Sequence, residues 1–516
     1  MKTETNSLLR RILLTIICLC AAATSFNHTT KASRAAAPVA LVNAASYEAT
    51  VAPGSIAALF GAGMATQTAI APSLPLPTTL GGVTVKLNGL NAPLFFVSPN
   101  QINLQVPGGV AAGSANIEVF NTGSTTAVGT GAVNVAESSP GIFTIDLSGK
   151  NQAVALNSDF SRNGDFDKLP GARPEVTGNV VVIYATGVGA TNLLVADGQP
   201  APASPLAQAI GATNVTIGGV AAQVQFSGLV PGFVGLWQIN AVIPASLPTD
   251  ANTPLTVELK GRQNSSTTLA IANRNEFGAV TGTVLNAITG SPLTNANITL
   301  QPQGGAGNGK TRTATTDALG KFSLYVINPG SYNLSAAATG FITASQAATI
   351  TGGQTNAATF ALTAPLPAGQ YRVIVTWQSQ IDLDAHMTGP NSSGSNNSRF
   401  HVWWLETTDL LNPVTTQLDV DGASPGPETL TFTPNSTGTY RFSVHNYTNR
   451  DTNGHAGLSQ SGVVVRIYSG NQQVQVLNAP GGGGTLWKVF EFSGGQLRVI
   501  NQLGDEVDAS NIRNSF

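Results

Sequence analysis

The chain has 516 residues, a formal net charge of −2 and only 10% charged residues. Without a basic field it offers no electrostatic footprint for nucleic acid or for an anionic membrane surface. Its length predicts three or four domains, at roughly 150 residues per domain. Abundant glycine (56) and proline (29) are typical of short strands joined by tight turns, not of charged amphipathic helices.

The N-terminus predicts a signal peptide over residues 1–25. Lys2 and two arginines precede an apolar run at 12–23, and small residues near its end offer cleavage sites. A membrane span needs about 20 apolar residues, so this run is too short to cross comfortably. We expect a secreted or cell-surface protein with no transmembrane span after the signal; a retained N-terminal anchor is the alternative. Both cysteines lie inside this segment, so the mature chain would have no disulfide, thiolate metal site or thiol nucleophile.

Residues 39–272 contain a degenerate tandem repeat. The segment 80–96 aligns with 210–226, and the Gln-Ile-Asn motif at 101–103 recurs at 238–240. The shared pattern of strand, glycine turn and strand predicts two copies of one β-sandwich. The copies are placed at 39–145 and 146–272.

Several motifs in this region carry a family resemblance. They are APGSIAALFGAGMA, PLFFVSPNQINLQVP, SPGIFT, VVVIYATGVGA, GQPAPASPL and PGFVGLWQINAVIP. Together they resemble an uncharacterised secreted domain of acidobacteria built from immunoglobulin-like (IPT/TIG-like) units. The resemblance implies extracellular display and brings no activity with it.

One loop in the second copy has the spacing of a cation site. Oxygen-bearing side chains alternate over residues 159–167, and Gly164 stands at the sixth position, as at the start of a calcium loop. Pro170 occupies the twelfth position, where such a loop needs a bidentate glutamate. The favoured interpretation is an Asx-rich surface turn.

Residues 277–365 show a new spacing of strands and turns. The segments GTV, GSPL, ANI, TDALGKF, PGSY and GF follow in order. They resemble the carboxypeptidase regulatory-like domain, a transthyretin-like sandwich. The resemblance implies an accessory module with no catalytic residues, related in fold to starch-binding domains.

A phosphate-loop pattern, G-x-x-x-x-G-K-T, occurs at 304–311 inside this module. A nucleotide loop requires a helix after it, whose N-terminal amides hold phosphate. Residues 311–316 alternate like a strand instead. We therefore predict a glycine-rich hairpin loop and no nucleotide.

Residues 366–516 form the last predicted module, a β-sandwich or jelly roll. The strand candidates are 371–377, 400–405, 415–420, 428–432, 438–446, 463–468, 474–477 and 485–492. The motifs VTWQSQIDLDAHMTGP, RFHVWW, LDVDGASPGPETLTF and GTYRFSVHNYTN resemble the uncharacterised YfaP-like domain of bacterial envelope proteins. That resemblance also comes without a known activity.

This last module concentrates the polar groups that could form a site. Alternation along a strand would place Asp382, Asp384 and His386 on one face, and Asp419 and Asp421 on one face of another strand. Unpaired carboxylates repel, and a divalent cation would relieve this: calcium through oxygen ligands, or zinc if the imidazole takes part. His401 and His445 could add ligands. The alternative, acids that support tight turns, is the favoured one, since Asp-Gly is itself a turn signal.

Trp403 and Trp404 are adjacent and would point to opposite faces of a strand, so we expect one of them to be exposed; it could stack on a sugar ring, or it could simply cover the edge of the core. No H-E-x-x-H motif occurs in the chain. The sequence therefore predicts an exported, non-catalytic, all-β protein of tandem sandwiches for surface display, adhesion or binding, with polysaccharide or envelope proteins as partners. A metal-dependent hydrolase at 366–516 and a purely structural stalk are the alternatives.

Overall fold

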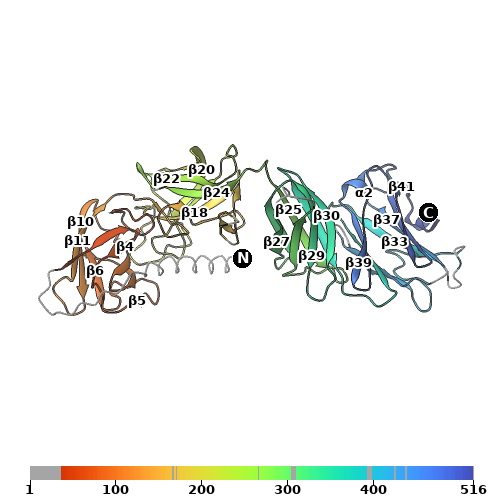
Figure 1. The fold of residues 1–516 in the computed structure, drawn as a ribbon, viewed down its shortest axis with the longest axis horizontal. Coiled ribbons are helices and arrows are strands. Elements are labelled where there is room, and N and C mark those ends of the chain that lie inside the picture. The colour runs from red at the N-terminus through yellow and green to blue at the C-terminus, as the bar shows by residue number, and fades with distance from the viewer. Residues whose placement is uncertain are drawn as a thin grey trace. The chain divides into compact units, whose positions relative to one another are not determined.

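The computed structural model describes residues 36–165, 168–169, 171–264, 266–303, 310–391, 395, 398–422, 426–435 and 438–514. Over these residues the protein is almost entirely β, which confirms the predicted fold class (Figure 1). The helical elements of the described part are α2 (Gly457–Gln460) and the 3-10 helix η1 (Ala509–Asn514), both far too short to reach across a bilayer. The predicted signal peptide at 1–25 lies outside the described residues. The chain forms two compact units, 1–274 and 275–516.

The first unit begins with two facing sheets. One contains β1 (Ala37–Pro38), β3 (Thr50–Val51), β6 (Val83–Leu87), β7 (Leu90–Asn91), β10 (Gly113–Asn121) and β11 (Gly129–Val135). The other contains β2 (Ala40–Asn43), β4 (Ile56–Phe60), β5 (Ala69–Ile70), β8 (Leu94–Val97) and β9 (Gln101–Gln105). In β6 the buried residues alternate, with Val83, Val85 and Leu87 in the core between the sheets, as period-two patterning requires.

The second part of this unit repeats the arrangement. Its long strands are β18 (Val180–Thr186), β19 (Thr213–Ile217), β20 (Val220–Leu229), β21 (Trp237–Val242), β22 (Asp250–Leu259) and β24 (Thr267–Ala272). The order β24-β22-β19-β20 corresponds to β11-β10-β6-β7, and β18-β21-β20 corresponds to β4-β9-β8. The repeat seen in the sequence is therefore a repeat of topology.

Short strands complete this second sandwich. They are β12 (Gly141–Ile142), β13 (Asn151–Gln152), β14 (Ala155–Leu156), β15 (Arg162–Asn163), β16 (Ala172–Arg173), β17 (Glu175–Val176) and β23 (Arg262–Gln263). Because β12 pairs with β18, the sheet of the second sandwich begins before the predicted boundary at 145/146.

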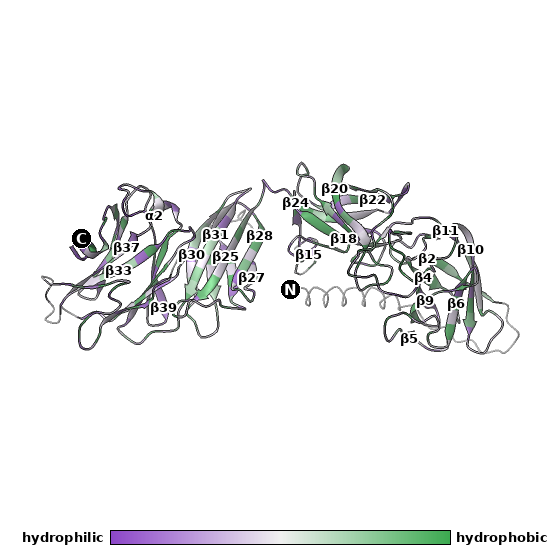
Figure 2. Ribbon diagram, turned by 180° about the vertical axis from the view of Figure 1, so that it is seen from behind, coloured by the Kyte–Doolittle hydropathy of each residue, from purple (hydrophilic) through white to green (hydrophobic). Residues whose placement is uncertain are grey.

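The second unit opens with the sandwich of residues 278–362. One sheet is β28 (Lys321–Ile327), β25 (Gly278–Asn286) and β31 (Thr355–Leu362). The other is β27 (Arg312–Thr315), β26 (Asn297–Pro302), β29 (Gly330–Ala337) and β30 (Ala344–Ile350). Figure 2 shows hydrophobic stretches along the strands of both units.

The rest of this unit is the C-terminal sandwich, residues 371–504. One sheet is β35 (Thr416–Val420), β36 (Glu428–Phe432), β32 (Tyr371–Thr376), β38 (Val464–Ser469) and β39 (Gln472–Asn478). The other is β34 (Phe400–Val402), β33 (Leu383–Gly389), β37 (Thr439–Asn446), β40 (Leu486–Ser493) and β41 (Gln496–Gly504). Ile374 and Tyr468 of this sandwich belong to the same buried cluster as the core of the sandwich at 278–362, so the two share apolar packing.

A C-terminal segment covers the outer face of the β33–β37 sheet. Ala509 and Ile512 of η1 pack with Trp403 and Leu486 in a small buried cluster. The backbone of Glu506 in the same segment is bonded to Thr485. The outer face of this sheet is therefore enclosed, and its polar residues are buried.

Candidate functional site

Two neighbouring strands, β33 and β37, place polar side chains on the enclosed face of their sheet. In β33 the side chains of Leu383, Ala385 and Met387 enter the core, so the alternate residues Asp384 and His386 point to the opposite face. The antiparallel register sets Asp384 directly opposite His445 of β37. All three polar residues are buried, with His386 and His445 at 0% exposure.

Asp384, His386 and His445, the histidine–aspartate triad, converge closely. One potential metal ligand atom from each lies within 4.8 Å of the others. Each residue also has one buried polar atom without a hydrogen-bond partner: Oδ2 of Asp384, Nε2 of His386 and Nδ1 of His445. Buried polar atoms normally have a hydrogen-bond partner, so three unpartnered atoms at one place indicate a binding site for a ligand from outside the protein.

The other nitrogen of each triad histidine is held in place. His445 Nε2 donates to the carbonyl oxygen of Glu506 at 2.8 Å, and His386 Nδ1 lies 2.8 Å from His401 Nε2. The ring of Trp403 stacks on His401, with 5.1 Å between centroids and 2° between planes, and on His386 at 5.8 Å. Burial lowers the pKa of all three histidines, that of His401 to about 3, so the imidazoles are neutral at pH 7.

A second group of carboxylates shares Asp384. Ligand atoms of Asp384, Asp421 and Glu428 also lie within 4.8 Å of one another. The loop between β35 and β36 is narrow at its base: a Cβ atom on Gly422 would overlap the carbonyl oxygen of Pro427, so glycine is required there. This narrow base brings Asp421 and Glu428 together.

Glu428 also serves the edge of β33. Its carboxylate accepts a hydrogen bond from the backbone amide of Ala385. Burial, followed by the charge of Asp384, raises the pKa of Glu428 well above its ordinary value. Burial and the charges of Asp382 and Asp421 likewise raise the pKa of Asp384 to about 7. These acids therefore repel each other's negative charge.

Beside the triad an open cavity of about 190 Å³, the acidic cavity, is lined by Asp382, Asp384, Asp421, Trp404 and Tyr447. Trp404 is 40% exposed and meets Tyr447 edge to face, at 6.4 Å between centroids. The guanidinium of Arg450 lies 3.8 Å from the centre of the Tyr447 ring, and this cation–π contact holds the ring in place. The cavity thus combines carboxylate oxygens with an accessible indole.

The structure brings together most, not all, of the residues predicted for a site. Asp384 and His386 join the triad, and Asp382 and Asp421 line the acidic cavity. Asp419 lies apart: its carboxylate accepts a hydrogen bond from Thr431 and lies 3.7 Å from Nε of Arg372. The cause is an irregularity in the β35–β36 register between Leu418 and Val420, which breaks the alternation expected to align Asp419 with Asp421.

One of the two tryptophans is exposed and the other buried, but neither lies in a strand as predicted, because β34 ends at Val402. Trp403 is buried against the imidazoles, so only Trp404 is available for stacking on a ligand. Glu428 and Tyr447 were absent from the predicted set, and His445, predicted only as an additional ligand, belongs to the triad. The alternation of His445 and Tyr447 in HNYTN, directly after an apolar strand, is the signal that marks two of them.

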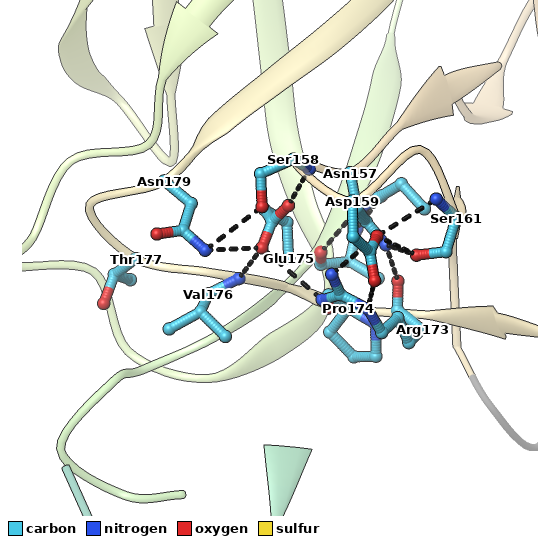
Figure 3. A network of polar contacts seen from close by, with 12 residues as sticks. Asn157, Ser158, Asp159, Ser161, Arg173, Pro174, Glu175, Val176, Thr177 and Asn179 are labelled. Atoms are coloured by element: carbon cyan, nitrogen blue, oxygen red, sulfur yellow. Dashed lines mark hydrogen bonds and ion pairs between the residues drawn. The ribbon is translucent and has the colours of Figure 1, made fainter. Parts of the chain in front are cut away.

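In the calcium-like loop of the first unit, the carboxylate of Asp159 is paired with other protein groups (Figure 3). The Asp159 carboxylate accepts hydrogen bonds from Ser161 and forms an ion pair with Arg173 at 2.8 Å. Arg173 also lies 3.4 Å from the buried carboxylate of Glu175, which in turn accepts from the amides of Ser158 and Val176. This arrangement agrees with the turn interpretation; Pro170 itself lies outside the described residues.

The phosphate-loop pattern at 304–311 falls largely outside the described residues. Downstream of its described end at 310–311, strand β27 pairs antiparallel with β26. A strand stands where a nucleotide loop would need a helix, as the sequence predicted.

Comparison with known proteins identifies one module. Residues 279–363 match the family model of the carboxypeptidase regulatory-like domain, which confirms the resemblance seen at 277–365. The search of curated proteins returned no match to this chain.

Among solved structures, the chain is similar to a candidate carbohydrate-binding protein from Pseudomonas aeruginosa, at 20% identity and a TM-score of 0.14, over 17% of this chain and 90% of that one. It is also similar to the Bacillus anthracis TIE protein, at 12% identity and a TM-score of 0.16, over 80% of this chain and 70% of that one. The major pilin subunit BcpA of Bacillus cereus matches at 11% identity and a TM-score of 0.15, over 55% of this chain and 95% of that one. These likenesses give no information on the ligand of this chain.

Proposed function

We propose that this protein is an exported, non-catalytic binding protein whose C-terminal sandwich holds a neutral polysaccharide at the acidic cavity. The observation that carries the proposal is the pairing of the 40% exposed Trp404 with carboxylates that line one open cavity. The other sandwiches would act as rigid spacers that present this module at the cell surface. The leader-like N-terminus supports export.

The chemistry of the lining suits a sugar. An exposed indole offers an apolar face against which a sugar ring can pack, and Tyr447 holds that indole at its edge. The carboxylates of Asp382 and Asp421 are acceptors for hydroxyl groups. A cavity of about 190 Å³ is smaller than the roughly 300–1,000 Å³ of sites that enclose drug-sized ligands, which favours contact with one or two sugar units of a longer chain.

The same lining argues against acidic polysaccharides. Burial, followed by the charge of Asp421, raises the pKa of Asp382, and burial and the charges of Asp382 and Asp421 raise that of Asp384 to about 7, a sign that negative charge is already crowded there. A uronic acid or sulfated sugar would add to this repulsion. The expected ligand is therefore rich in hydroxyl groups and carries no negative charge.

Retention of the full chain on insoluble polysaccharides tests this proposal. The intact protein should be retained by at least one neutral polysaccharide, such as a β-glucan, xylan or starch, and not by alginate or pectate at the same salt concentration. Trp404→Ala should weaken retention tenfold or more, since truncating a central aromatic commonly costs about 2 kcal/mol. Leu410→Ala is the matched control, because Leu410 is 96% exposed and does not line the cavity.

Three outcomes would contradict the proposed function or part of it. Failure of the intact protein to bind any neutral polysaccharide would favour the stalk alternative. Equal retention of the Trp404 and Leu410 variants would remove the acidic cavity from the binding surface. Release of new reducing ends from a retained polysaccharide would favour the metal-dependent hydrolase.

A further inference from the structure

The histidine–aspartate triad brings together three buried polar atoms that have no hydrogen-bond partner. The carbonyl oxygen of Glu506 can only accept a hydrogen bond, so His445 Nε2 carries the proton of that bond and Nδ1 is left as an unprotonated acceptor. In His386 the contact from Nδ1 to His401 leaves Nε2 as the free nitrogen. Asp384 Oδ2 completes the group.

A single water molecule satisfies such a group poorly. Water donates two hydrogen bonds, whereas the site offers three acceptors when His386 Nδ1 donates to His401 and the Asp384 carboxylate is deprotonated. The three residues offer ligand atoms within 4.8 Å of one another, so small side-chain movements would bring each atom to about 2.0–2.2 Å from one shared cation. One cation can be coordinated by all three atoms at once.

We propose that His386 Nε2, His445 Nδ1 and the Asp384 carboxylate bind one divalent transition-metal ion, with zinc as the best fit. Two imidazole nitrogens and one carboxylate form a ligand set that zinc accepts, whereas calcium takes oxygen ligands. The site also has the outer contacts that metal-binding histidines need: a backbone carbonyl orients His445, and the buried His401 orients His386. Trp403, packed on both His386 and His401, closes the apolar side.

The ligand set differs from the one that the sequence predicted. Asp419 is excluded by its contacts with Arg372 and Thr431, and His445 takes part instead. Asp384 belongs to both the triad and the acidic cavity, so the ion would lie next to the surface proposed to bind sugar. The metal proposal stands independently of the sugar, because its evidence is the geometry of the triad.

Zinc binding by the full chain tests the inference. The protein is stripped with a chelator and titrated with Zn²⁺ alone, and the bound metal is measured by elemental analysis after dialysis. The cysteines at 18 and 20 are replaced by serine in every sample, since thiolates of an uncleaved leader would compete for zinc. One equivalent of zinc per chain is expected.

Ligand variants and matched controls locate the ion. His445→Gln and Asp384→Asn should each weaken zinc binding by more than about 100-fold, beyond the 10–100-fold typical of changing a ligand's hydrogen-bond partner. His455→Gln and Asp451→Asn, the same changes outside the triad, should alter it by less than about threefold. His401→Phe keeps a ring against Trp403 and removes the hydrogen-bond partner of His386, so it should fall within the 10–100-fold range.

A triad variant that does not fold cannot report on metal binding, so a second measurement uses the unaltered chain. Should a triad variant fail to fold, Co²⁺ replaces Zn²⁺ in the unaltered triad, and its absorption spectrum should show low-symmetry nitrogen and oxygen ligation. Trp404→Ala should leave zinc binding unchanged, which separates failure of this inference from failure of the sugar proposal. An apo protein that binds no zinc, or triad variants that bind it like their controls, would overturn the inference.

Discussion

The buried arginine between the two sandwiches of the second unit provides a sharp test of how they are held together. Arg466 of β38 is fully buried, and its guanidinium lies over the ring of Phe360 at 4.9 Å. Nη1 donates to Thr376 at 2.9 Å, Nη2 donates to the side-chain oxygen of Gln346 in β30, and Nε has no partner. Burial lowers the pKa of Arg466, a sign that its charge is poorly compensated.

The change Gln346→Leu removes one of the two acceptors without leaving a large cavity. Hydrogen bonds to charged groups contribute about 1.5–3 kcal/mol, so the free energy of unfolding should fall by about that amount. The double variant with Arg466→Met should recover part of the loss, because replacing both buried polar partners by apolar groups costs less than stranding one. In the double-mutant cycle, the double variant should therefore be less destabilised than the sum of the two single variants.

Denaturant unfolding followed by tryptophan fluorescence measures this effect. Of the five tryptophans, Trp237 lies in the first unit, and the C-terminal sandwich carries the other four, at 377, 403, 404 and 487. Gln354→Leu is the control, since Gln354 lies exposed in the same sandwich as Gln346. A Gln346 variant that unfolds at the same midpoint as this control would refute the argument that the buried charge depends on Gln346.

Three further predictions concern stability. Arg173→Met should destabilise the first unit by about 3 kcal/mol, because it removes the cation paired with the fully buried Glu175 carboxylate and leaves that charge to the amides of Ser158 and Val176 and the side chain of Asn179; hydrogen exchange of residues 150–180 measures this, and a loss below about 0.5 kcal/mol would contradict it. Burial opposes ionisation of Asp159, but Arg173 and Ser161 outweigh it and lower its pKa, so its contribution is full above about pH 4 and is lost as the pH falls through the folded-state pKa. Thermal unfolding of Asp159→Asn between about pH 3 and pH 5 should therefore depend less on pH than that of the unaltered chain, and parallel curves would contradict this. Tyr332→Phe removes the hydroxyl that donates to the Asn328 carbonyl at 2.8 Å and should cost about 1 kcal/mol, measured by exchange of β29 amides and contradicted by unchanged protection.

Much of the fold was predictable because apolar alternation and turn residues mark half-buried strands. Most strand candidates in the C-terminal sandwich lie within a few residues of the observed strands. The prediction omitted β33 and β41. The segment of β33, LDAHMTG, does alternate apolar and polar residues, and Asp384 and His386 were placed on one face of a strand, but the segment was not among the strand candidates. The segment of β41 is an edge strand with a largely exposed or half-exposed surface and little apolar signal.

The candidate site was predictable only in part because it depends on pairing between strands distant in sequence. The spacing of Asp384 and His386 is local and was found from alternation alone. The position of His445 opposite Asp384 follows from the β33–β37 register, which the sequence does not state. The displacement of Asp419 follows from a local irregularity that leaves no motif.

The enclosure of the triad by residues 505–514 has a practical consequence for anyone who handles this protein. The carbonyl of Glu506 orients His445, and Ile512 packs with Trp403, so this tail forms one wall of the histidine pocket. Trimming it, or attaching a purification tag too close to it, would let solvent reach the imidazoles. Affinity tags belong at the N-terminal side of the mature chain, after the predicted signal peptide, and a polyhistidine tag should be cleaved before any metal titration.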